Sequence, residues 1–138
     1  MVSTAVKGTL LVSVIGDATT VTGLLLTGMG ERNLKGQTNF MVVDKETTDA
    51  MIEAQLRQLI DRSDIGIILI SQNAAERARH VITEHDKIFP TILEIPNKDN
   101  PYDPEKDTIV CRAAGILWGA DTGAEKLKEM QASQASSR

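Results

Sequence analysis

Four short apolar runs alternate along the chain with longer segments whose apolar residues recur at helical spacing. The runs are rich in Ile, Val and Leu and mostly lack alternating polar residues, which is typical of strands covered on both faces. They span Leu10–Ile15, Phe40–Val43, Ile65–Ile70 and Thr91–Ile95. Alternation of this kind predicts a parallel sheet with right-handed crossover connections and helices on both of its faces.

The segments between the runs have the apolar spacing of amphipathic helices. They span Ala18–Met29, Thr48–Arg62 and Ala74–Asp86, and Asn73 with Glu76 resembles a capping box at the start of the third. Strands and helices in this order predict an α/β fold with a four-stranded parallel sheet flanked by helices, in a Rossmann-like or receiver-like topology.

Three residues around the first predicted helix have expected structural roles. Asp17 directly precedes the helix, where a carboxylate accepts hydrogen bonds from free backbone N–H groups. Gly16 stands between strand and helix, and Gly30 lies at the helix end, where glycine is favoured. An acid-catalyst or metal-ligand role for Asp17 is the alternative, and the cap is favoured because Asp is strongly preferred at that position.

The segment after the fourth run is expected to end in a helix that docks on another chain. Pro101 and Pro104 lack an N–H and stop whatever precedes them, and Asp103 is expected to cap a helix whose first turn holds Pro104. The apolar arc of this helix is broader than docking on one sheet face needs. The residues expected at the partner interface are Ile109, Val110, Arg112, Ala113, Ile116, Leu117 and Trp118. The alternative is that both apolar stripes pack against the sheet of the same domain.

The 138 residues fit one domain with a C-terminal extension. We expect an α/β domain over 1–96, a proline-rich linker and partner-binding helix over 97–119, and a partly disordered tail over 120–138. Within the tail, Ala124–Met130 favours a helical turn or two.

Composition limits the possible partners and surroundings. The net charge of −4 argues against nucleic acid, whose binders need a basic patch. No stretch approaches the roughly 18 apolar residues of a membrane span, so no direct membrane insertion is expected. The single cysteine, Cys111, cannot form an internal disulfide, which favours a reducing compartment.

The residues expected at the carboxyl ends of the strands match no catalytic or cofactor motif. A dinucleotide fingerprint needs several glycines between strand and helix, and only Gly16 stands there. A receiver domain needs an acceptor Asp after its third strand and a Lys after its last, where this chain has Ser71 and Pro96. His80 and Glu84 share a helix face, but two aligned ligands do not make a zinc shell. We therefore expect no catalytic residue, no metal site and no cofactor. A stand-alone receiver-like signalling domain remains the alternative function, followed by a small hydrolase.

Four segments carry a resemblance to a known family. They are Ile15–Glu31, Asn39–Thr48, Asp64–Gln72 and Ile92–Asp107, and the last is highly specific because of its proline spacing. In these segments the chain resembles the F-subunit family of eukaryotic V-type proton ATPases.

This resemblance implies a non-catalytic rotor subunit. In such complexes the F subunit and the D subunit, a long coiled coil, form the central stalk of the soluble sector. The stalk turns inside the A/B hexamer, which hydrolyses ATP, and its rotation drives the membrane ring that moves protons. Contacts with the A/B hexamer and with the membrane-sector connector are implied. So is a cytoplasmic location, peripheral on the cytosolic face of endomembranes such as the vacuole, lysosome or endosome.

Overall fold

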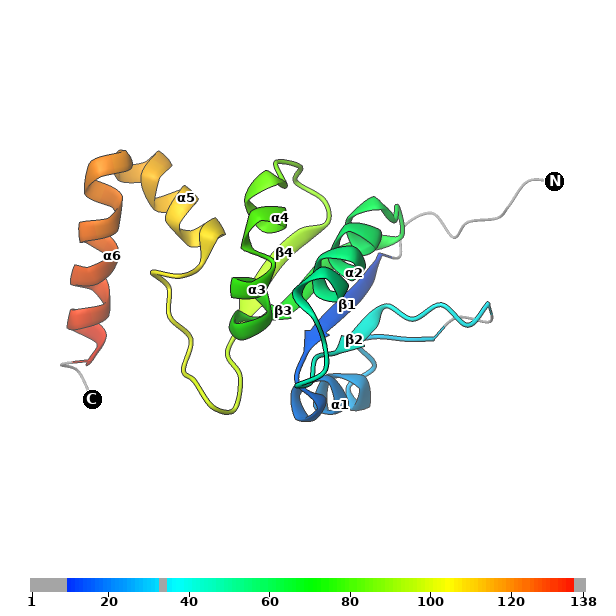
Figure 1. Ribbon diagram of the computed structural model, residues 1–138. Coiled ribbons are helices and arrows are strands. Elements are labelled where there is room, and N and C mark those ends of the chain that lie inside the picture. Colours follow the sequence, from blue (N-terminus) through cyan, green and yellow to red (C-terminus); the bar gives the residue numbers. More distant parts are fainter. Residues whose placement is uncertain (1–9, 33–34, 136–138) are drawn as a thin grey trace.

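The sheet has four parallel strands in the order β2-β1-β3-β4, in a computed structural model that describes residues 10–32 and 35–135 (Figure 1). The strands are β1 (Leu11–Gly16), β2 (Phe40–Val42), β3 (Ile65–Ser71) and β4 (Thr91–Ile95). Each coincides with a predicted run to within one residue at either end. The predicted α/β fold with a four-stranded parallel sheet is therefore confirmed. Parts of the predicted tail, at 136–138, lie outside the described residues.

Six helices occur in the described part of the chain. They are α1 (Ala18–Leu26), α2 (Asp49–Asp61), α3 (Gln72–Arg77), α4 (Arg79–Glu84), α5 (Thr108–Trp118) and α6 (Ala120–Ala135). The first two match the predicted segments, and α2 is capped by the Thr48 side chain, which accepts a hydrogen bond from the Met51 N–H. Both helices thus begin at a hydroxyl or carboxylate side chain that satisfies a free backbone donor.

The third predicted helix, Ala74–Asp86, is wrong as a single element. Two short helices replace it, and they meet at Ala78, whose φ of −117° and ψ of 26° interrupt the helical path. The expected capping box is also wrong, because α3 begins at Gln72 and Asn73 lies inside it. The N-cap is Ser71, the last residue of β3, so the strand passes into the helix without a loop and the helix begins before Asn73 can cap it.

The main core lies between the sheet and the helices α2, α3 and α4, which cover one face (Figure 1). Ile15 of β1 is paired in register with Ile70 of β3, and both side chains are fully buried against Leu56 of α2. Neighbouring residues of a strand point to opposite faces, so Val14 belongs to the other face, where α1 contacts β1 and β2. Val14 is buried, because α1 covers that half of the face.

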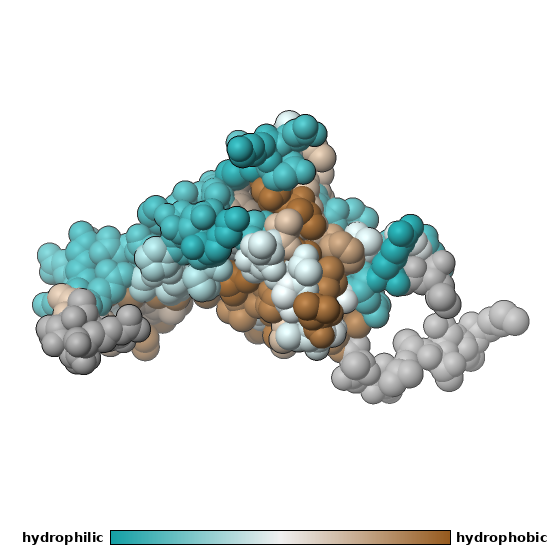
Figure 2. All heavy atoms as spheres, turned by 90° about the horizontal axis from the view of Figure 1, so that it is seen from below, coloured by the Kyte–Doolittle hydropathy of each residue, from teal (hydrophilic) through white to brown (hydrophobic). Residues whose placement is uncertain are grey.

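The other half of this second face is left uncovered. Ile67 of β3 and Leu93 of β4 are 37% and 42% exposed, although parallel sheets are normally covered on both sides. Seen from below, apolar residues gather across the middle of the molecule, with hydrophilic residues to one side (Figure 2). The expectation of helices on both faces therefore holds fully only for the β2–β1 half, because α5 does not pack there.

The last predicted helix begins four residues later than its prolines indicate. The sequence predicts a start at Asp103 and Pro104, but backbone hydrogen bonds from Lys106 N to Asp103 O (3.2 Å) and from Asp107 N to Pro104 O (3.3 Å) close a separate turn. Asp107 is the N-cap, and its Oδ1 accepts hydrogen bonds from the first free N–H groups of α5. Pro104 is accommodated in the turn instead, where its fixed φ is equally suitable.

The tail forms more helix than the turn or two expected. Helix α6 runs for 16 residues and lies beside α5 as the second arm of a helical hairpin, at the left of Figure 1. Gly123 faces the backbone of Ala114 so closely that a Cβ there would come within 2.9 Å of it. Leu127, one turn further along α6, is 8% exposed. The added helix thus depends on contact with α5, which its own sequence does not reveal.

Candidate partner interface

The C-terminal end of α5 is the most exposed apolar part of the helical hairpin. Ile116, Leu117 and Trp118 are 80%, 70% and 39% exposed. Helix α6 covers the side of α5 that carries Ala114, which is 3% exposed, and leaves these three side chains free. The alternative in which both apolar stripes of the helix pack on their own sheet is therefore wrong for this end of α5.

The other residues expected at the interface have different surroundings. Ile109 packs against the main core, and Val110 beside it is half-buried. Ala113 is exposed, one turn before Leu117. Arg112 donates from its guanidinium to the backbone oxygens of Thr83 (3.1 Å) and His85 (3.3 Å) at the end of α4. The predicted set thus divides into residues that attach α5 to the body and residues that remain open to a partner.

Two apolar side chains beside α5 were missed from the sequence. Ile88 and Phe89, between α4 and β4, are 80% and 62% exposed. Ile88 lines a shallow hollow of about 260 Å³ together with Ile109 and Arg112 of α5. The signal was an Ile-Phe pair inside a polar loop, which periodicity cannot interpret because no helix or strand contains it. These residues extend the open apolar surface from α5 towards β4.

Asp17 serves as a helix cap. Its carboxylate accepts hydrogen bonds from the Thr19 hydroxyl, from the Thr20 hydroxyl (2.7 Å) and from the Thr20 N–H (3.2 Å). The hydroxyl bonds, that of Thr19 first, lower the pKa of Asp17 from 3.8 to about 2. A carboxylate that is ionised and occupied in this way stabilises the start of α1 and is poorly suited to deliver a proton.

Gly16 and Gly30 occupy tight positions on either side of this helix. A Cβ on Gly16 would lie 3.5 Å from the Ser71 side chain, which is ordinary contact. Gly30 has a φ of +94°, and a Cβ there would come within 2.8 Å of Leu25. Only a residue without a side chain takes this conformation at little cost.

The titratable residues of the described part of the chain form no metal centre. No group of three His, Cys, Asp or Glu side chains in those ranges is arranged to hold a metal ion. His80 lies 3.3 Å from Glu53 of α2, and Glu84 pairs with Arg57, so the two residues predicted to share a helix face each contact α2 instead. Among the described residues there is also no helix long and apolar enough to cross a membrane.

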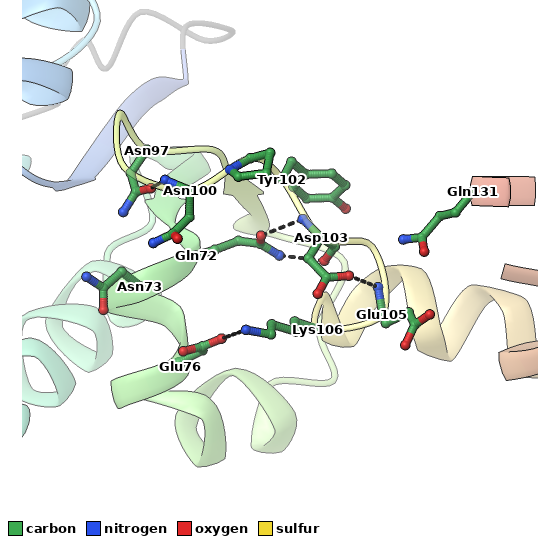
Figure 3. A pocket seen from close by; sticks show the side chains of 11 residues that line it. Gln72, Asn73, Glu76, Asn97, Asn100, Tyr102, Asp103, Glu105, Lys106 and Gln131 are labelled. Carbon is green, nitrogen blue, oxygen red and sulfur yellow. Dashed lines mark hydrogen bonds and ion pairs between the residues drawn. The ribbon is translucent and has the colours of Figure 1, made fainter. Parts of the chain in front are cut away.

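A polar hollow of about 580 Å³ lies at the carboxyl ends of β3 and β4 (Figure 3). Parallel sheets often bind ligands at this edge, so the bonds made by its side chains matter. Gln72 is bonded to the backbone of Asp103, and Lys106 forms an ion pair with Glu76 at 3.0 Å. The side chains that approach one another in this hollow therefore join the linker to α3.

The comparisons with known proteins agree on one family. The model of the ATP synthase (F/14-kDa) subunit matches residues 12–112. The V-type proton ATPase F subunit of Rattus norvegicus is 50% identical over 111 residues, which are 80% of this chain and 93% of that relative. The V-type proton ATPase F 1 subunit of Drosophila melanogaster is 51% identical over 113 residues, which are 82% of this chain and 90% of that relative. The crystal structure of the V-type ATP synthase F subunit from Archaeoglobus fulgidus has a TM-score of 0.45 and 18% identity, and covers 64% of this chain and 99% of its own.

A small parallel α/β body that carries a projecting helical hairpin with an open apolar end has the form of a subunit that acts by association. The chain belongs to the F-subunit family of V-type proton ATPases, a family of non-catalytic subunits in a proton-transporting complex.

Proposed function

We propose that this chain is a central-stalk rotor subunit in the soluble sector of a V-type proton ATPase. In this role it binds the coiled-coil D subunit through the open end of α5 and helps to couple ATP hydrolysis in the A/B hexamer to proton transport. Further contacts reach the A/B hexamer and the membrane-sector connector, and the complex lies on the cytosolic face of endomembranes. The observation that carries the proposal is the exposure of Ile116 and Leu117, at 80% and 70%, in a chain of this family.

Burial of the open end of α5 would supply part of the binding free energy. Each large apolar side chain contributes roughly 1.5–3 kcal/mol when it leaves water. Association costs about 4–15 kcal/mol in lost motion, so Ile116, Leu117 and Trp118 alone give modest affinity. The exposed pair Ile88 and Phe89 lies beside α5 and supplies the second surface that a durable stalk contact requires.

Co-purification with the D subunit tests this proposal. Ile116→Asp and Leu117→Asp place a charge where an apolar contact is expected and should each weaken binding by roughly 10- to 150-fold. Leu26→Asp is the matched control, because Leu26 is 85% exposed on α1, away from α5. Circular dichroism should report the same folded signal for all three variants.

Two results would count against the proposal. Equal recovery of the D subunit with Ile116→Asp, Leu117→Asp and Leu26→Asp would mean that α5 is not the binding surface. Loss of the folded signal in Ile116→Asp or Leu117→Asp would mean that these side chains belong to the internal core.

A further inference from the structure

A carboxylate is buried at the edge of the sheet, where the α/β body meets the linker. The side chain of Glu94, on the edge strand β4, is 1% exposed. It forms an ion pair with the guanidinium of Arg79, the first residue of α4. A buried charge without a partner is strongly destabilising, so this carboxylate requires the bonds that Arg79 provides.

The same pair reaches the first residue of α5. Nη1 of Arg79 donates to the hydroxyl of Thr108 at 2.9 Å, and Oε1 of Glu94 accepts from the backbone N–H of Thr108 at 3.5 Å. One ion pair therefore connects α4, β4 and α5. A buried network whose donors and acceptors are mutually satisfied rigidifies the elements that it joins.

A second bridge holds the linker before α5. The Gln72 side chain donates to Asp103 O and accepts from Asp103 N, both at 2.7 Å, as the dashed lines of Figure 3 show. It also donates to Glu94 Oε2 at 3.3 Å, which ties the bridge to the ion pair. Replacement of one hydrogen bond would thus disturb the whole set.

The network ends at the helix cap. The Tyr102 hydroxyl donates to Oδ2 of Asp107 at 2.6 Å, and Oδ1 of Asp107 caps α5. Burial, together with the Asp107 hydrogen bond, raises the pKa of Tyr102, so this hydroxyl remains a donor throughout the physiological range. Beyond its first turn, α5 is attached to the body by the Ile109 packing and by exposed hydrogen bonds from Arg112, while Ile116 is open to water.

We propose that Glu94, Arg79 and Gln72 form a latch that sets the direction in which α5 leaves the α/β body. The latch residues are positioning residues that act through the first turn of α5, and their consequence for partner binding rests on the function proposed above. Helix α5 has 11 residues and acts as a lever, so a tilt of about 20° at its start moves its far end by roughly 5 Å. A displacement of this size would take Ile116 and Leu117 out of register with a rigid partner.

Distance measurement between two spin labels on the full chain tests the latch. The native thiol is removed by Cys111→Ser, and labels are attached through Ala54→Cys on α2 and Leu117→Cys at the far end of α5. In this background Glu94→Gln and Gln72→Leu should each shift or broaden the distance distribution by about 5 Å. Arg57→Gln is the matched control, because it removes an ion pair with Glu84 of α4 whose side chains are 52% and 62% exposed. It should leave the distribution unchanged.

Circular dichroism and thermal unfolding accompany each variant to separate positioning from stability. An unchanged distance in folded Glu94→Gln and Gln72→Leu, even with a lower melting temperature, would overturn the latch. The same disturbance in Arg57→Gln, or a distribution already that broad in the unsubstituted background, would also overturn it. If Glu94→Gln does not fold, the near-isosteric Gln72→Leu decides the matter alone. Because no partner is present, this result is independent of whether the D subunit co-purifies.

Discussion

The approach of α6 to α5 at Gly123 gives a sharp prediction, because a second glycine serves as its control. A Cβ on Gly123 would lie 2.9 Å from the carbonyl carbon of Ala114 and 3.0 Å from its oxygen, which are backbone atoms that cannot rotate away. A Cβ on Gly115 of α5 would meet nothing within 4 Å. Gly123→Ala should therefore separate the hairpin, and Gly115→Ala should leave it intact.

The expected magnitude follows from the difference between the two variants. Alanine is favoured over glycine in a helix by roughly 1 kcal/mol, and this gain is common to both. Forcing extra volume into a packed contact costs about 1–3 kcal/mol, and this cost applies to Gly123→Ala alone. The α5–α6 contact should consequently be weaker in Gly123→Ala than in Gly115→Ala by about 1–3 kcal/mol.

Amide hydrogen exchange of α6 measures this difference directly. Protection of the α6 amides should be roughly 5- to 150-fold lower in Gly123→Ala than in Gly115→Ala. Fluorescence provides a second readout, since Trp118 is the single tryptophan and immediately precedes the turn between the helices. Equal protection and equal emission in the two variants would refute the reasoning that α6 is held by close backbone approach.

Two further predictions concern the stability of the α/β body. Asp17→Ala should cost at most about 1 kcal/mol at neutral pH, since the cap is partly exposed. The folded state lowers the pKa of Asp17 from 3.8 to about 2, so its carboxylate stabilises fully above about pH 4, and the difference from Asp17→Ala in urea unfolding should vanish as the pH falls to about 2. Leu56→Ala should cost about 2–5 kcal/mol in thermal unfolding because Leu56 is fully buried, whereas Met51→Ala on the same helix, at 53% exposure, should cost far less.

The local sequence determines the order of strands and helices. Each strand run is short, apolar and bounded by polar residues or turn formers, and these signals are contained within the run itself. Caps such as Asp17 and Thr48 are equally local, because each bonds to a backbone group within three residues. The family resemblance was visible for the same reason, since its segments are contiguous in the chain.

Only the tertiary structure decided where α5 begins and which way it faces. Asp103 and Asp107 are both suitable caps by local rules, and the choice depends on Gln72, 31 positions away from Asp103, whose amide binds both backbone groups of that residue. The extent of α6 likewise depends on the fit of Gly123 against Ala114. Contacts between residues far apart in the chain carry no periodic signal, so the pattern predicted an apolar helix here but not which of its side chains remain open to a partner.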